Sequence, residues 1–340
     1  MTTAMASRAE TAEGETVPRF VPHPWLRNGH LQTIVGRYLA GPRVFLPSTY
    51  HEVDVSEGDR VAALESVPDD WRRGRPTALL VHGLAGCARS PYVVRVASRL
   101  RRLGILVVRM NLRGAGSGFG LARGTYHAGR TDDLRRVVEW MARRNPGSPV
   151  ALIGFSLGAN LVLKLAAEAS VSPLEPVDCV LAANPPIDLA ECCRYIQRPS
   201  NRIYDRNFVK QLRVVVGRLH AAFPELGPAN LPKSLSLFDF DDIYTGPRNG
   251  FSGAAEYYEK SSSGPLLASI EVPGLVVHAE DDPFIPVGPF HQVKFPSCLA
   301  LEMIPGGGHL GYLSHRPWMG DHRWLDGRLT NWLQAHWSLN

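Results

Sequence analysis

Short apolar runs alternate with amphipathic segments along the chain from about residue 77 onward. The apolar runs predict strands, and the segments with apolar residues at helical spacing predict helices. The predicted strands are residues 78–82, 105–110, 150–155, 179–184, 274–280 and 299–304, and the predicted helices include residues 91–103, 131–144, the segment after residue 155 and about 329–337. Near-continuous apolar strands separated by helices are typical of a mostly parallel, doubly wound α/β sheet that is covered on both faces. Residues 42–66 are expected to add two antiparallel strands at one edge.

Residues 186–270 interrupt this alternation. They contain a helical piece at 207–223, loops rich in Pro and Gly, and many aromatic residues, among them Phe208, Phe223, Phe238, Phe240, Tyr244, Phe251, Tyr257 and Tyr258. In a doubly wound sheet, such an insertion lies over the carboxyl ends of the strands, where ligands bind. We therefore predict a core formed by residues 20–185 and 271–340, with a mainly helical cap at 186–270. The alternative is a structural insertion with an ordinary aromatic core.

The composition is that of a globular protein with a large core, because 44% of the 340 residues are hydrophobic and 20% are charged. The net charge of +5 comes with scattered arginines and no basic block, which argues against nucleic-acid binding and allows at most peripheral membrane contact. The five cysteines include no C-x-x-C pair and predict a reducing compartment, the cytoplasm. Residues 1–19 lack an apolar signal segment and are expected to be a disordered leader. The composition does not indicate an oligomeric state.

A single serine stands between two glycines where a predicted strand meets a predicted helix. Residues 150–167 read VALIGFSLGANLVLKLAA, so Ser156 lies between Gly154 and Gly158. On such a tight turn the serine Oγ projects from the backbone, and side chains at the two glycines would collide with the neighbouring strand and helix. This is the G-x-S-x-G nucleophile elbow, and it predicts Ser156 as a catalytic nucleophile. The alternative is that small residues simply fill a tight turn.

An activated serine needs a base within hydrogen-bond reach and a carboxylate that orients this base. In this type of fold the chain order is serine, acid, histidine, and the two partners follow the last strands. Residues 279–286 (AEDDPFIP) come at the end of one late strand, and residues 305–312 (PGGGHLGY) directly follow the next. They predict Asp282 as the acid and His309 as the base.

Two adjacent aspartates compete for the role of the acid. In residues 282–286 (DPFIP) the acid begins a turn that Pro286 closes, so the Asp282 carboxylate is expected to face the histidine loop. Asp281 lies one residue before the position at which this turn begins. It is expected to cap the turn or to face solvent.

Two backbone N–H groups are expected to bind the oxyanion that forms when an ester carbonyl is attacked. One belongs to Leu157, the residue after the nucleophile, and the other to the loop after the first central strand. That loop reads HGLAG (residues 82–86), in which the glycines allow the backbone to turn its amides inward. Leu84 is the natural second donor.

Other candidate chemistry has weaker support. His315, Asp321 and His322 could be metal ligands, but no compact motif such as H-E-x-x-H accompanies them. Residues 111–120 (NLRGAGSGFG) do not match the dinucleotide motif G-x-G-x-x-G in any frame, and we interpret them as a flexible glycine turn. The sequence therefore implies neither a metal nor a cofactor.

Together these motifs resemble the YheT-like branch of the α/β-hydrolases, which includes animal alpha/beta-hydrolase-domain lipases and fungal medium-chain acyl ethyl ester synthase/esterases. The resemblance rests on HGLAG (82–86), NLRGAGSG (111–118), YHAGRTDDL (126–134), GFSLGAN (154–160), AEDDPFIP (279–286) and GGGHLGY (306–312). Upstream, Asn28, His30 and Gln32 match that branch's N-x-H-x-Q-T signature, and packing and functional roles are both open for them. The resemblance implies an α/β-hydrolase fold and assigns the acid to Asp282.

The sequence thus predicts a serine carboxylesterase that hydrolyses small-molecule acyl esters of short to medium chain length through an acyl-enzyme intermediate. If the cap aromatics line an acyl pocket, acyl chains of about four to ten carbons are expected to be preferred over acetyl, because each buried methylene is favourable. One alternative is an acyltransferase or thioesterase with the same residues. Another is a non-catalytic binding protein on the same fold.

Overall fold

The computed structural model describes residues 17–39 and 44–339. Most of the predicted leader, residues 1–16, lies outside the described part of the chain. The end of that leader contacts the folded chain, because the indole N–H of Trp324 donates a hydrogen bond of 2.8 Å to the carbonyl of Pro18. Among the described helices, none combines the length and the apolar character that crossing a bilayer requires.

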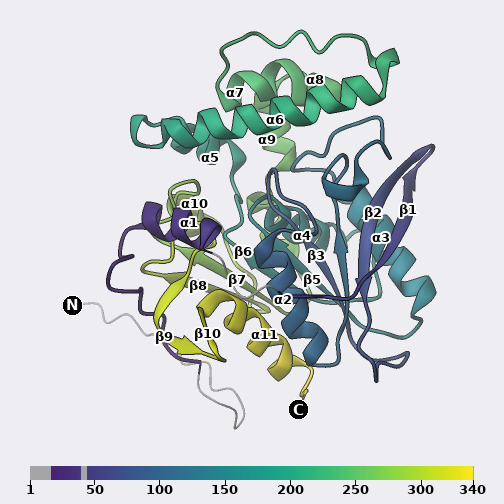
Figure 1. Cartoon of the computed structure of the whole chain (residues 1–340), viewed down its shortest axis with the longest axis vertical. Coiled ribbons are helices and arrows are strands. Elements are labelled where there is room, and N and C mark those ends of the chain that lie inside the picture. The colour runs from purple at the N-terminus through teal and green to yellow at the C-terminus, as the bar shows by residue number, and fades with distance from the viewer. Residues whose placement is uncertain (1–16, 40–43, 340) are drawn as a thin grey trace.

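Among the described residues, eight strands form one sheet in the order β1-β2-β4-β3-β5-β6-β7-β8 (Figure 1). The strands are β1 (Thr49–Ser56), β2 (Asp59–Ser66), β3 (Thr77–Val81), β4 (Leu106–Met110), β5 (Val150–Phe155), β6 (Val177–Ala183), β7 (Gly274–Ala279) and β8 (Leu299–Ile304). Strand β2 is antiparallel to both β1 and β4, and the other neighbouring strands are parallel. The structure confirms the predicted mostly parallel sheet with two antiparallel strands at one edge.

The parallel register brings the ends of three central strands to one level. Val81 at the end of β3 lies opposite Met110 of β4 and Gly154 of β5. The loops that follow these strands therefore meet at the carboxyl ends of the strands, where α/β proteins bind their ligands.

Helices cover both faces of the sheet. The described helices outside residues 186–270 are α1 (Gly29–Tyr38), α2 (Pro91–Arg102), α3 (Thr131–Arg144), α4 (Leu157–Glu168), α10 (Gly288–Gln292) and α11 (Trp324–His336). Adjacent residues of β3 point to opposite faces: Leu80 packs in a cluster with residues of α2 and α11, and Leu79 packs with residues of α3 and α4. This is the predicted doubly wound arrangement.

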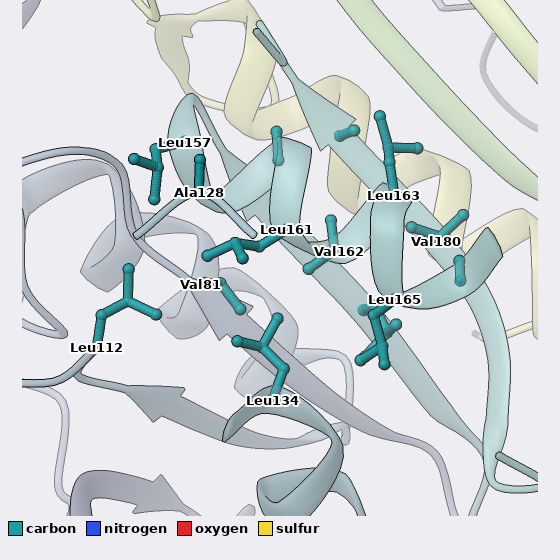
Figure 2. Close-up of a cluster of buried hydrophobic side chains, with 14 of the residues drawn as sticks. Val81, Leu112, Ala128, Leu134, Leu157, Leu161, Val162, Leu163, Leu165 and Val180 are labelled. Atoms are coloured by element: carbon teal, nitrogen blue, oxygen red, sulfur yellow. The ribbon is translucent and has the colours of Figure 1, made fainter. Parts of the chain in front are cut away.

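Helix α4 begins directly after Ser156 and is buried on nearly all sides. Leu161, Val162 and Leu165 are each 0% exposed. Figure 2 shows these side chains in one cluster with Val81 of β3 and Leu134 of α3. A helix that is apolar all round belongs to a protein interior, and this packing holds the first turn of α4 in a fixed position.

The helices between β6 and β7 lie together beyond one edge of the sheet, drawn in teal and green in Figure 1. They are α5 (Leu189–Ile196), α6 (Arg202–Ala222), α7 (Leu237–Phe240), α8 (Gly246–Arg248) and α9 (Ala254–Ser261), with a π-helical turn at Asp241–Thr245. Val216, Phe240 and Tyr244 form a small core of their own within this layer. These helices lie within residues 186–270, the range predicted to form the cap. The boundaries of the cap stay a prediction.

Helix α1 and a hairpin of β9 (Leu313–Trp318) and β10 (Asp321–Arg323) have no counterpart among the predicted elements. They depend on each other, because the buried Gln32 side chain of α1 donates to the carbonyl of Leu313 and accepts from its N–H. Contacts between opposite ends of a chain leave no local pattern in the sequence.

The last helix begins at Trp324, about one turn before its predicted start near residue 329. Trp324 is buried and packs edge-on against Phe20, with ring centroids 5.7 Å apart. This tertiary contact extends the helix beyond the segment that its periodicity marks.

Candidate active site

Ser156 lies on the turn between β5 and α4, in a backbone conformation with φ 53° and ψ −123° that L-residues rarely adopt. A Cβ at Gly158 would lie 2.3 Å from the carbonyl oxygen of Val81, and a Cβ at Gly154 would lie 2.3 Å from the carbonyl oxygen of Gly158. Both positions therefore require glycine, as the elbow motif predicts. The strained turn presents the serine side chain at the edge of the sheet.

The structure brings Ser156, His309 and Asp282 into one hydrogen-bonded chain. Nε2 of His309 lies 2.9 Å from Oγ of Ser156, and Nδ1 lies 2.7 Å from Oδ2 of Asp282. Because an ionised carboxylate can only accept, Nδ1 carries a proton and Nε2 is left to accept the serine proton. This geometry allows His309 to act as a base toward Ser156.

The Asp282 carboxylate is 1% exposed and satisfied by several donors. Its Oδ1 accepts from the N–H groups of Phe284 at 2.7 Å and Ile285 at 3.2 Å. Burial acts to raise the pKa of Asp282, but the charge and hydrogen bond of His309 and the N–H of Phe284 outweigh it, so the pKa is lowered. The carboxylate thus remains ionised and able to stabilise an imidazolium.

Asn184 is a site residue that the sequence analysis misses. It directly follows β6, is 0% exposed and has a positive φ of 47°. Its Nδ2 donates at 2.6 Å to Oδ2 of Asp282, and its Oδ1 accepts from the hydroxyl of Tyr312 at 2.9 Å. Tyr312 therefore orients Asn184, which in turn orients the carboxylate. A signal was available, because Asn184 ends an apolar strand run just as the acid follows one.

The loop that carries His309 is held from two sides. The N–H of His309 donates to Oγ1 of Thr33, and the N–H of Gly308 donates to Oδ1 of Asp281, both at 2.8 Å. The expectation that Asp281 caps its turn or faces solvent is therefore wrong. The histidine loop follows β8, the neighbour of β7, so both carboxylates that follow β7 face this loop.

The residues of the N-x-H-x-Q-T signature have structural partners in α1. Asn28 caps the helix by accepting from the N–H of His30 at 2.9 Å. Gln32 bonds the backbone of Leu313 in β9. Nδ1 of His30 lies 3.0 Å from the hydroxyl of Tyr204 in α6, and the two rings stack with centroids 5.6 Å apart. Of the two roles left open for this signature, the contacts support packing.

In the loop after β3, two tyrosine hydroxyls accept hydrogen bonds from backbone N–H groups. The N–H of Gly83 donates to the Tyr92 hydroxyl at 3.0 Å, and the N–H of Ala85 donates to the Tyr126 hydroxyl at 2.8 Å. The hydrogen bonds found within residues 17–39 and 44–339 do not engage the intervening N–H of Leu84. That N–H is therefore available to a ligand.

Leu157, the other expected oxyanion donor, is the first residue of α4. The N–H groups of the first helical turn have no acceptor within the helix, and they carry the positive end of its dipole. Leu84, Leu157 and Ser156 all line one cavity. The two amides can thus converge on a carbonyl oxygen that is bound beside the serine.

His82 anchors the start of the same loop. It is 0% exposed, its Nδ1–H donates to the carbonyl of Gly83 at 2.8 Å, and its Nε2 accepts from the N–H of Leu112 at 3.1 Å. Burial lowers the pKa of His82 to about 4, against the opposing effect of the Gly83 carbonyl. The ring is therefore neutral and serves as a fixed spacer between two loops.

A mostly apolar cavity of about 100 Å³ adjoins Ser156, and we call it the acyl cavity. Most of its wall comes from residues 186–270. Of the aromatic residues predicted to line an acyl pocket, Phe208, Tyr257 and Tyr258 do so. Phe240 and Tyr244 instead pack in the small core described above.

A second cavity, of about 530 Å³, is lined by His309 and by residues of α1 and α2. Leu84, Phe208 and Phe284 border both cavities, so the two cavities adjoin at these residues. The ring of Phe284 packs on His309 with centroids 4.5 Å apart. We call this second space the outer cavity.

The residues considered as metal ligands, His315, Asp321 and His322, lie in and beside the β9–β10 hairpin and do not form a ligand cluster in the described structure. The group whose atoms do lie close together there is Asp178, Cys179 and His336. Oδ2 of Asp178 already accepts from His336 at 2.7 Å, and burial raises the pKa of the Cys179 thiol. A protonated thiol is a poor metal ligand.

Over residues 76–316 the chain matches the family model described as alpha/beta hydrolase fold. It is 28% identical to the Escherichia coli (strain K12) protein named "Putative esterase YheT", over 98% of each chain. It is 30% identical to the "Medium-chain fatty acid ethyl ester synthase/esterase 2" of Saccharomyces cerevisiae, over 70% of this chain and 58% of that protein. The solved structure of the Pyrococcus furiosus esterase Pf2001 shares the fold, with a TM-score of 0.55 at 16% identity over 87% of this chain and 98% of that one. The chain is a hydrolase and belongs to the alpha/beta hydrolase family.

Proposed function

We propose that this protein is a serine carboxylesterase that hydrolyses short- to medium-chain acyl esters through an acyl-enzyme intermediate. The observation that carries the proposal is the hydrogen-bonded chain of Ser156, His309 and Asp282 beside an apolar cavity. Leu84 and Leu157, whose backbone N–H groups can bind an oxyanion, line the same cavity as Ser156. The names of the relatives, which are an esterase and an ester synthase/esterase, support acyl esters as the substrate class.

In the proposed reaction, Ser156 Oγ attacks the ester carbonyl carbon while its proton passes to Nε2 of His309. The N–H groups of Leu84 and Leu157 bind the oxyanion, and Asp282 stabilises the imidazolium. The tetrahedral intermediate expels the alcohol, which takes the proton from His309. Water, deprotonated by His309, then attacks the acyl-enzyme and releases the acid.

We assign the acyl part and the alcohol part of the ester to different cavities. His309 must reach the oxygen of the leaving alcohol, so the alcohol part belongs in the outer cavity. The acyl part then occupies the acyl cavity of about 100 Å³. Because an apolar cavity of about 150 Å³ holds benzene, the acyl cavity favours the short end of the predicted range, about four to six carbons.

The experiment compares hydrolysis of p-nitrophenyl esters, from acetyl to decanoyl, and covalent labelling by a fluorophosphonate probe. Ser156→Ala is expected to abolish labelling and to lower kcat by about 10⁶, with an unchanged circular dichroism spectrum. Ser172→Ala, which removes an exposed serine hydroxyl, is the matched control and is expected to behave as the wild type. Unchanged hydrolysis by purified Ser156→Ala would refute the proposal. Absence of labelling in the wild type would instead favour a binding protein.

Acyl transfer to an alcohol is a second candidate activity. It is favoured by the outer cavity of about 530 Å³ beside His309, which can hold an acceptor alcohol, and by the yeast relative named as an ester synthase. Product analysis with added ethanol separates the two activities. A transferase converts the acyl group to the ethyl ester, whereas a hydrolase releases the free acid.

We also propose that the protein acts on a small-molecule ester in a reducing compartment, the cytoplasm, with at most peripheral membrane contact and no nucleic-acid partner. All five cysteines are unpaired, including the adjacent Cys192 and Cys193. Cell fractionation with detection of the protein tests this placement. Recovery in an extracellular or tightly membrane-bound fraction would contradict it.

A further inference from the structure

Asp241 is a buried carboxyl group in the acyl cavity that the proposed mechanism does not use. It is 8% exposed and lines the same cavity as Ser156. The described residues that line this cavity include no lysine and no arginine. Taking a carboxylate out of water without a cation is costly. Its presence beside a nucleophile therefore needs a functional reason.

The backbone around Asp241 is also unusual. Asp241–Thr245 form a π-helical turn between α7 and α8. Such turns are rare, and they occur frequently at functional sites. The first and last residues of the turn, Asp241 and Thr245, both line the acyl cavity. The turn thus places a carboxylate and a hydroxyl on one wall.

Contacts within the protein use only part of the carboxylate. The Tyr258 hydroxyl donates to Oδ2 of Asp241 at 2.8 Å, and the Thr245 hydroxyl, like that of Tyr258, acts to lower the pKa of the carboxyl group. A carboxylate can accept about four hydrogen bonds, so capacity remains for a ligand. Burial raises the pKa of Asp241 to about 6, while the two hydroxyls act to lower it. At neutral pH the group is an ionised acceptor.

The other polar groups of this wall are neutral. Nδ1 of His127 accepts from the N–H of Gly129 at 3.2 Å, so the ring proton is on Nε2. Burial, with help from nearby arginines, lowers the pKa of His127 to about 3. The Tyr257 hydroxyl accepts from the N–H of Ala128 at 3.0 Å. The cavity therefore combines apolar walls with one anionic acceptor.

On the basis of the proposed esterase function, we propose that the acyl cavity selects acyl groups that carry a hydroxyl on a distal carbon, and that Asp241 accepts the hydrogen bond of this hydroxyl. Repulsion from the carboxylate disfavours an anionic acyl group. An ammonium group would lose its hydration in a mostly apolar cavity without full compensation. A hydroxyl has the smallest desolvation cost of these groups and supplies the donor that a plain alkyl chain lacks.

The test uses pairs of ethyl esters that differ only in a terminal hydroxyl or methyl group. The pairs are 4-hydroxybutanoate with pentanoate and 5-hydroxypentanoate with hexanoate, with enzyme-free blanks for spontaneous lactone formation. The wild type is expected to show a kcat/KM ratio of at least about 10 in favour of the hydroxyl in one pair or both. Asp241→Leu is expected to bring this ratio below one, because the apolar side chain favours the methyl group.

Asp241→Asn keeps an acceptor for the Tyr258 hydroxyl and is the second variant. A neutral acceptor is weaker than an ionised one, so the ratio is expected to fall by about threefold or more. Asp242→Asn is the matched control, since Asp242 is the exposed neighbour outside the cavity, and the wild-type ratio is expected to persist.

A wild-type ratio near one, or an unchanged ratio in Asp241→Leu, overturns hydroxyl selection. Hydrolysis of the plain esters in the same assay leaves the esterase proposal standing. If the wild type hydrolyses none of the esters, both proposals fall. If Asp241→Leu does not fold, Asp241→Asn decides by the same comparison, and an unchanged ratio there overturns the inference.

Discussion

The backbone N–H of His309 donates a hydrogen bond of 2.8 Å to the hydroxyl of Thr33, which belongs to α1 near the other end of the chain. The same hydroxyl donates to the carbonyl of Gly29 at 2.6 Å. Helix α1 and the histidine loop are therefore one structural unit. The position of the candidate base depends on a residue that takes no part in the proposed reaction.

Thr33→Val keeps the size of the side chain but removes the acceptor for the His309 N–H. Because small displacements of a catalytic group are costly, kcat is expected to fall by about 10- to 100-fold with little change in KM. Thr33→Ser retains the hydroxyl and is expected to recover most of the loss. Steady-state kinetics with a p-nitrophenyl ester measures both variants. Equal rates for Thr33→Val and the wild type would show that the loop holds its position without this bond.

Asp282→Asn is expected to lower kcat by about 10⁴, as loss of the orienting acid does in other triads. Asp281→Asn is the matched comparison, because an asparagine Oδ1 can still accept from the N–H of Gly308. Its expected loss is less than about tenfold. Both variants are assayed on the same ester at several pH values. A larger loss at Asp281 than at Asp282 would reverse the assignment of the acid.

Ile196→Ala is expected to enlarge the acyl cavity, since Ile196 is 7% exposed and lines it. Each additional buried methylene contributes about 0.8 kcal/mol, close to fourfold in kcat/KM. The preferred acyl length is therefore expected to shift upward by one or two carbons. Val214→Ala removes an apolar side chain of the same region that is 49% exposed, and it serves as the control. An unshifted length profile in Ile196→Ala would place the acyl chain elsewhere.

Asp241→Asn is expected to stabilise the protein above pH 6. The pKa of Asp241 is raised from 3.8 to about 6 in the folded state by burial. The folded state thus binds more protons between these values, and stability falls as the pH rises from about 4 to 6. Above that range the ionised group costs about 3 kcal/mol, which the asparagine avoids.

Urea unfolding at pH 4.5 and pH 8 measures this effect. The variant is expected to be more stable than the wild type by about 3 kcal/mol at pH 8 and by only about 1 kcal/mol at pH 4.5. Asp242→Asn is the control, because Asp242 is an exposed residue and an asparagine Oδ1 can still accept from the N–H of Ala254. A stability difference that is the same at both pH values would contradict the linkage.

Much of the architecture was predictable because buried parallel strands are apolar along their whole length, as residues 150–155 are. The three proposed catalytic residues could be named for a related reason. Ser156, Asp282 and His309 each follow such a strand, and the carboxyl ends of parallel strands share one edge of a sheet. Asn184 ends a strand in the same way and could have been found by this rule.

Thr33 and Asp241 could not have been found in this way. Thr33 meets His309 across 276 residues. The N-x-H-x-Q-T signature ends at Thr33, but spacing and periodicity do not show that its partner is the histidine loop. Asp241 stands among aromatic, aliphatic and acidic residues (237–244, LFDFDDIY), and this local pattern does not show which of the acids is buried. Its burial beside Ser156 follows only from how residues 186–270 pack over the sheet edge.

The sequence by itself determined the local conformations: the apolar strands, the helices between them, and the two glycines that allow the strained turn at Ser156. These follow from side-chain periodicity and steric limits, which act over a few residues. Only the tertiary structure decided which polar groups meet, such as Asp281 with Gly308. Burial and long-range hydrogen bonding are properties of the packed chain, because each depends on atoms that distant segments supply.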